Sequence, residues 1–126
     1  EGDLKVHTVD GLPLRIVEGD YFQFNETEFD ACYDRAAMIA MPDSKRTEYV
    51  THTLDRLSSS ACVLLISLQY DGDKQGPPFS VNENSVVSLW GSQIQKIASE
   101  NLALTNPQYK EEGHSIFEES VWRIQP

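Results

Sequence analysis

The chain has 126 residues, enough for one domain with its own core, and its 40% hydrophobic and 10% aromatic residues are typical of a globular protein. Its 10 basic and 20 acidic side chains give a formal net charge of −10, which repels phosphate backbones and anionic lipid surfaces. We therefore expect neither a nucleic acid nor a membrane as a partner, and no apolar run approaches the ~18 residues of a membrane-spanning helix.

The first signals in the chain predict a β-hairpin. Asp10-Gly11 separates two apolar runs, at 6–9 and 12–17, and this dipeptide favours a tight turn between antiparallel strands. The second run continues into residues 18–22, which are typical of a strand that passes into a loop.

A strand–helix–strand unit is expected next. Residues 29–33 predict a strand, and residues 36–41 predict one or two helical turns. The almost wholly apolar run at 62–68 predicts a central strand that is covered on both faces.

The helix between these strands is expected to run from Ser44 to Leu57. Asp43 or Ser44 supplies an N-cap oxygen, and Val50, Leu54 and Leu57 form the buried stripe at spacings of four and three.

The second half of the chain predicts one more helix and two closing strands. Residues 71–80 form a loop, Asn82 caps the helix, and Gly91 ends it. Strands are expected at 94–104 and 115–124, and two strands joined without a helix must be antiparallel. Because strands and helices otherwise alternate, we expect an α/β fold with a largely parallel sheet.

The two cysteines, Cys32 and Cys62, lie in strand-like apolar runs and are expected to be buried, reduced thiols. No group of histidines and cysteines has the spacing of a zinc site. The composition therefore predicts a cytoplasmic protein that binds no metal.

Three stretches, at 29–42, 69–71 and 76–81, closely resemble the thiopurine S-methyltransferase family, and the resemblance extends over most of the chain. It implies a three-layer, Rossmann-like methyltransferase sheet that is parallel with a C-terminal antiparallel strand pair. The family's first strands and its glycine-rich loop are absent from these residues. Residues 1–126 are therefore expected to be the C-terminal part of a single methyltransferase domain.

The resemblance places Arg35 in the active site, as a contact of S-adenosyl-L-methionine close to the substrate, and Asp34 would orient it. A guanidinium can bind a carboxylate in bidentate fashion, and a structural ion pair is the alternative reading. The resemblance also places Asp20 and Tyr21 at the adenine of this cofactor. For Asp20 the alternative is an Asx-type turn that closes a strand.

On the substrate side the resemblance implies a stiff apolar loop that contains Pro77, Pro78 and Phe79, whose alternative is an ordinary loop before a helix. Tyr70 and Asp71 end the central strand at the same edge of the sheet, where ligands bind in α/β folds. The loop that contains Lys110 departs from the family pattern, so whether this residue reaches the substrate stays open.

The family's reaction is methyl transfer from S-adenosyl-L-methionine to a soft acceptor, the thiol of an aromatic or heterocyclic compound, and in bacterial members also selenium or tellurium compounds. No catalytic residue is required beyond those that position the reactants. The resemblance implies an enzyme with a small-molecule thiol or chalcogen substrate that is monomeric when complete, and the 126-residue chain alone is expected to be inactive. The alternative is a non-catalytic fragment or binding module that retains half of the methyltransferase fold.

Overall fold

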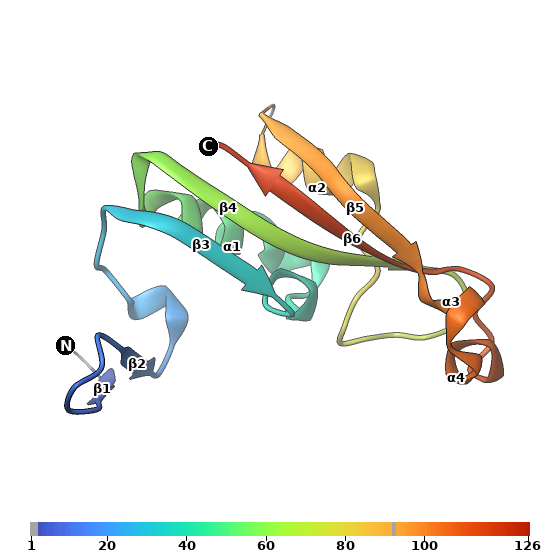
Figure 1. Ribbon diagram of the computed structural model, residues 1–126, viewed down its shortest axis with the longest axis horizontal. Coiled ribbons are helices and arrows are strands. Elements are labelled where there is room, and N and C mark those ends of the chain that lie inside the picture. The colour runs from blue at the N-terminus through green and yellow to red at the C-terminus, as the bar shows by residue number, and fades with distance from the viewer. Residues whose placement is uncertain (1–2, 92) are drawn as a thin grey trace.

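The computed structural model describes residues 3–91 and 93–126. Its elements in chain order (Figure 1) are β1 (Lys5–Thr8), β2 (Arg15–Glu18), the 3-10 turn η1 (Tyr21–Gln23), β3 (Phe29–Arg35), the 3-10 turn η2 (Met38–Ala40), α1 (Asp43–Asp55), β4 (Leu57–Tyr70), α2 (Glu83–Trp90), β5 (Ile94–Asn101), α3 (Leu102–Thr105), α4 (Pro107–Glu111) and β6 (Phe117–Ile124).

The strands β3, β4, β6 and β5 form, in that order, a sheet that we call the main sheet. β3 and β4 are parallel, with Arg35 opposite Ile66. β6 lies antiparallel on the other side of β4, with Glu119 opposite Leu68. The parallel pair is what the expected strand–helix–strand unit implies, because a helical crossover returns the chain in its original direction. β5 pairs with β6 antiparallel, which confirms the predicted C-terminal antiparallel pair. With one parallel and two antiparallel pairings among the described residues, the main sheet is nevertheless mixed rather than largely parallel.

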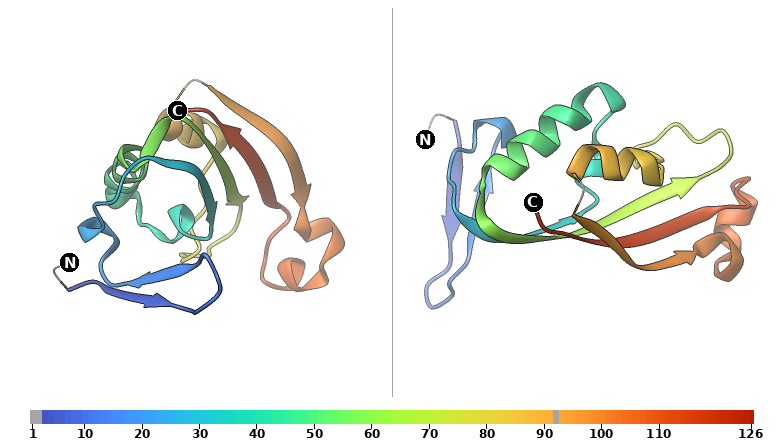
Figure 2. Two further views of the ribbon diagram at one scale, coloured as in Figure 1. Left: turned by 60° about the vertical axis from the view of Figure 1, so that its left-hand side comes forward. Right: turned by 90° about the horizontal axis from the view of Figure 1, so that it is seen from above.

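The helices α1 and α2 cover one face of the main sheet, and no helix of the described residues covers the other face (Figure 2). Side chains alternate accordingly along β4: Val63 and Leu65 are fully buried, whereas Leu64 between them is exposed. Tyr33, which lies opposite Leu64 on β3, is 61% exposed. The described residues thus form two layers, and they do not supply the third layer that the sequence led us to expect.

The helix α1 differs from its prediction at both ends. It begins at Asp43, and the N-cap is Pro42, which makes no side-chain capping bond. Asp43 instead contributes a favourable negative charge in the first turn. The helix ends at Asp55 because the chain enters β4 at Leu57, so the predicted last residue belongs to a strand.

The buried face of α1 is also displaced from the predicted stripe. It consists of Arg46, Tyr49, Val50 and Thr53, while Leu54 is only half-buried. Of the predicted stripe, Val50 is fully buried, whereas Leu54 and Leu57 are only partly buried and pack against the edge of the core.

The second half of the chain follows the prediction closely, with one exception. Asn82 caps α2 by accepting a hydrogen bond from the Ser85 N–H at 2.9 Å, and Gly91 ends the helix with φ at 108°. The exception is the strand expected at 94–104, which stops at Asn101. There the Asn101 side chain accepts a hydrogen bond from the Ala103 N–H at 3.1 Å and caps the short helix α3.

The core lies between the helices and the main sheet. Trp90 and Trp122 are both buried, and each indole N–H has an acceptor: Met38 Sδ for Trp90 at 3.2 Å and Ser67 Oγ for Trp122 at 2.8 Å. Both cysteines are free and half-buried. In the described part of the chain, no helix combines the length and the apolar character that crossing a membrane requires.

Candidate active site

A pocket of about 350 Å³ opens at the end of the main sheet where β3 ends. Its walls are mainly apolar and come from the turn η2, from β4 and from the loop before α2. The lining residues are Arg35, Ala36, Ile39, Ala40, Ile66, Leu68, Pro77, Pro78 and Glu119. The two charged residues are Arg35 from β3 and Glu119 from β6, so the pocket has an apolar floor between a cation and an anion.

The neighbours Asp34 and Arg35 point to opposite faces of the sheet, as successive strand residues must. Asp34 is 2% exposed and accepts hydrogen bonds from the backbone N–H groups of Ala37 and Met38, both at 3.2 Å. It also accepts one from the Tyr49 hydroxyl at 2.6 Å. Asp34 therefore fixes the turn that follows Arg35, and its side chain does not contact the guanidinium as an orienting residue would.

Arg35 itself is exposed, and its side chain forms no hydrogen bond or ion pair with any residue that the structure describes. A guanidinium is always charged and carries five donors in a fixed plane. At the rim of an apolar pocket, this unpaired group is available to an anionic or polar ligand.

The loop before α2 is held against the sheet and the turn η2. The Tyr70 hydroxyl donates to the Pro78 carbonyl at 2.7 Å, the Phe79 N–H donates to the Ile39 carbonyl at 2.7 Å, and the Val81 N–H donates to the Leu68 carbonyl at 2.8 Å. Each of Pro77 and Pro78 is preceded by a cis peptide bond. Because these hydrogen bonds hold the loop in place, the two prolines form one wall of the pocket.

Three residues predicted on the substrate side, Phe79, Tyr70 and Asp71, lie outside this pocket's lining. The Phe79 ring lies under the Arg46 guanidinium, 5.5 Å from centroid to Cζ, on the side of α1. The Tyr70 ring stacks on Phe117, with centroids 5.3 Å apart, so Tyr70 reaches the pocket only through its hydroxyl bond to the proline loop.

Asp71 binds the segment that leads into β6. Its carboxylate accepts hydrogen bonds from the Ser115 hydroxyl and from the backbone N–H groups of Ser115 and Ile116, both at 3.0 Å. The Ser115 hydroxyl, followed by the Ile116 N–H, lowers the pKa of the Asp71 carboxyl below its ordinary value. The structure thus gives Asp71 a supporting contact between two distant loops rather than a place in the pocket.

This arrangement predicts a pH dependence of stability. Because the pKa of Asp71 is lower in the folded state, its carboxylate stabilises the fold above the unfolded value of about 3.9 and loses this contribution as the pH falls through the folded value. Asp71→Asn should therefore lower the free energy of unfolding at neutral pH and flatten its decline below about pH 4. Urea unfolding across this range is the measurement, with Asp73→Asn on the same loop as the control. An unchanged acid slope in Asp71→Asn would contradict the assignment.

Asp20 and Tyr21 line a second pocket, of about 220 Å³, together with Leu4, Val17, Gly19 and Phe24. Asp20 caps η1 by accepting a hydrogen bond from the Phe22 N–H at 2.9 Å, which is the Asx-type turn of the alternative reading. Within the described residues, β2 pairs only with β1, in a two-stranded sheet outside the main sheet. Asp20 therefore follows β2 and does not lie at the end of a strand of the main sheet, as Arg35 does.

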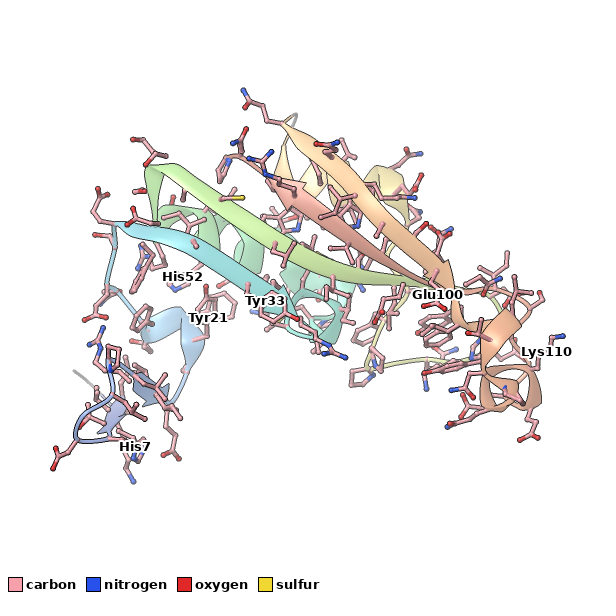
Figure 3. The ribbon with its side chains drawn as sticks, in the orientation of Figure 1. His7, Tyr21, Tyr33, His52, Glu100 and Lys110 are labelled. Atoms are coloured by element: carbon pink, nitrogen blue, oxygen red, sulfur yellow. The ribbon has the colours of Figure 1, made fainter. Side chains whose placement is uncertain are left out.

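Tyr21 nevertheless connects the two pockets through packed side chains. Its hydroxyl bonds to Thr53 Oγ1 at 2.7 Å, and its ring packs on Tyr49 with centroids 5.5 Å apart. Tyr49 in turn donates to Asp34, next to Arg35. Figure 3 shows Tyr21 beside His52 of α1, and these rings make an edge contact with centroids 4.8 Å apart.

The remaining candidate, Lys110, is exposed on α4, at the far end of the molecule from the hairpin (Figure 3), and does not line the pocket. Six pocket residues were not among the predicted site residues: Ala36, Ile39, Ala40, Ile66, Leu68 and Glu119. Period-two alternation could have placed Ile66 and Leu68 on one face of β4. The position of Glu119 in the pocket depends on the register between β6 and β4, and no local signal in the sequence predicts that register.

Comparison with known proteins identifies the family of the chain. The family model described as Thiopurine S-methyltransferase (TPMT) matches residues 3–126. Proteins named thiopurine S-methyltransferase are similar to the chain: one from Aliivibrio fischeri is 40% identical over 87% of the chain and 52% of its own length, and one from Photobacterium profundum is 38% identical over 98% and 58%.

A third such relative, from Xanthomonas campestris pv. campestris, is 33% identical over 94% of the chain and 57% of its own length. The chain thus spans about half the length of the curated relatives that it matches. Since the family model covers residues 3–126 of the 126, the chain belongs to the thiopurine S-methyltransferase family.

Proposed function

We propose that the full-length protein transfers a methyl group from S-adenosyl-L-methionine to a soft acceptor atom, the thiol of an aromatic or heterocyclic compound. The observation that carries this proposal is the exposed guanidinium of Arg35 at the rim of an apolar pocket, without a partner among the described residues, in a chain of this family. The names of the relatives support a thiopurine as the type of acceptor.

The pocket suits the demands of such a reaction. A flat ring can lie against Ile66 and Leu68 on the sheet side, with Pro77 and Pro78 closing over it, and these apolar walls exclude water. Arg35 then favours the ionised form of the acceptor's sulfur and holds it in place. Because aromatic thiols ionise near neutral pH, no general base is needed.

S-adenosyl-L-methionine supplies a methyl group that is already activated on a sulfonium. The residues of the second pocket fit its adenine end, because the pocket is largely apolar and one Asp20 oxygen already accepts the Phe22 N–H while the other is available to an amino group. Tyr21 would contact one edge of the adenine ring. Its packing on Tyr49 would fix the position of the second pocket relative to the pocket at Arg35.

The same pocket admits other soft acceptors. Selenium and tellurium compounds share with thiols a large, polarisable acceptor atom, so we include them in the proposed substrate class. The partners are small molecules, and we propose that the complete protein acts as a monomer in the cytoplasm.

The test is transfer of labelled methyl from S-adenosyl-L-methionine to 6-mercaptopurine by the full-length protein. We expect an S-methylated product whose formation saturates with the acceptor. Absence of transfer to this compound, to thiophenol and to selenite would contradict the proposal and favour a non-catalytic binding module.

A further inference from the structure

Glu119 lies across the candidate active site from Arg35. In the register of the main sheet, Arg35 stands opposite Ile66 and Glu119 opposite Leu68, and both apolar residues line the pocket. Two strand spacings of about 4.8 Å and two residue rises of about 3.3 Å separate the Cα atoms of Arg35 and Glu119 by roughly 12 Å. The pocket thus has its two charges on opposite sides of an apolar floor.

These charges do not neutralise each other. No ion pair joins Arg35 to Glu119 within the ranges 3–91 and 93–126, although two long side chains could span this separation. Glu119 is half-buried, and its neighbour on β4 is the apolar Leu68. On β5 it stands opposite Glu100, which is exposed at the end of the sheet near α3 (Figure 3). This side of the pocket is therefore negative, and the side of Arg35 is positive.

A ligand that fills the pocket removes water from both charged groups, so it must replace the lost hydrogen bonds or weaken binding. A thiolate or thione sulfur satisfies Arg35. Glu119, as a carboxylate, can only accept hydrogen bonds and therefore requires a donor on the distal edge of the ring. A ring N–H meets this requirement, a plain benzene ring does not, and a carboxylate at that edge adds repulsion.

We propose that Glu119 determines acceptor specificity: its carboxylate accepts a hydrogen bond from a ring N–H of a heterocyclic thiol whose sulfur lies at Arg35, and it disfavours thiols that carry a carboxylate opposite the sulfur. This inference rests on the proposed function, since it concerns the same pocket.

The experiment compares three acceptors in the full-length protein: 6-mercaptopurine with ring N–H groups, thiophenol without them, and 4-mercaptobenzoate with a distal carboxylate. Glu119→Leu should lower kcat/KM for 6-mercaptopurine relative to thiophenol by about ten- to a hundred-fold, the range expected for loss of one charge-assisted hydrogen bond. Glu119→Gln keeps an acceptor oxygen and should lose less. Both variants should use 4-mercaptobenzoate better than the wild type does.

Two matched controls separate contact from overall charge. Glu118 is the adjacent residue on β6 and points to the opposite face, and Glu100 is on the same face but outside the pocket lining. Glu118→Gln and Glu100→Gln should leave the acceptor ratio within about two-fold of wild type, because neither removes the contact. An unchanged ratio in Glu119→Leu, or an equal change in a control, would overturn the proposal. Thiophenol turnover shows that each variant is folded.

A direct binding measurement distinguishes failure of this inference from failure of the proposed function. Isothermal titration with 6-mercaptopurine should give a ten- to hundred-fold weaker affinity for Glu119→Leu than for the wild type, about the same factor as in turnover. If the wild type transfers no methyl group but shows this difference, the function is wrong and the role of Glu119 stands. Equal affinities, or no binding by the wild type, would overturn the role of Glu119.

Discussion

Arg35→Ala in the full-length protein is expected to lower kcat/KM for methyl transfer to an aromatic thiol by about ten- to a hundred-fold, because it removes a charge-assisted contact of roughly 1.5–3 kcal/mol. Stability should change by less than about 0.5 kcal/mol, since the exposed guanidinium has no partner in the part of the chain that the structure describes. Arg35→Lys should restore activity only in part, because a point charge does not reproduce the planar donor array.

The matched control for this variant is Arg123→Ala. Arg123 is also an exposed arginine, and it lies on the same face of the main sheet, opposite Leu64, but outside the pocket lining. Its loss should leave kcat/KM within about two-fold of wild type. Labelled-methyl transfer and thermal unfolding are measured in parallel. Full activity in Arg35→Ala, or a loss that merely follows unfolding, would show that Arg35 does not act in the pocket.

The second large effect is expected on stability. Asp34→Ala leaves three donors without this acceptor, namely the half-buried Ala37 N–H, the buried Met38 N–H and the buried Tyr49 hydroxyl, and should lower the free energy of unfolding by about 2–4 kcal/mol. Asp34→Asn keeps one carbonyl oxygen and should lose less. Urea unfolding of the full-length protein gives both values.

Asp30→Ala is the control for Asp34, because Asp30 lies on the same strand but is exposed, and its side chain accepts a hydrogen bond from the Ser58 hydroxyl at 3.1 Å. Its effect should remain within about 0.5 kcal/mol. A double-mutant cycle with Tyr49→Phe should show coupling between Asp34 and Tyr49, since the two share a hydrogen bond. If Asp34→Ala is no more destabilising than Asp30→Ala, the turn after Arg35 does not depend on this carboxylate.

The parts of the fold that the sequence predicts are those with local signals. The Asp10-Gly11 turn, the cap at Asn82 and the parallel pair of β3 and β4 each follow from a short motif or from a crossover rule. The N-terminus of α1 was predicted less well, because Pro42 occupies the N-cap and the neighbouring polar residues then have no capping role.

The sequence predicts a site residue only where the ends of neighbouring parallel strands bring it to the pocket. Arg35, Pro77 and Pro78 meet because β3 and β4 are parallel and end near one another. Asp71 resembles a ligand-binding carboxylate in sequence, yet its partners Ser115 and Ile116 are more than forty positions away. Hydrogen bonds between residues so far apart in the sequence depend on the assembled sheet, and no periodicity or motif predicts them.

The central claim is that the acceptor binds between Arg35 and the Pro77-Pro78 loop, and NMR of the full-length protein with labelled Ile, Leu and Val methyl groups tests it most directly. Nuclear Overhauser effects from the ring protons of 6-mercaptopurine should reach the methyl groups of Ile39, Ile66 and Leu68, which line this pocket. Effects that reach Leu4 and Val17 of the second pocket instead would place the acceptor elsewhere and contradict the claim.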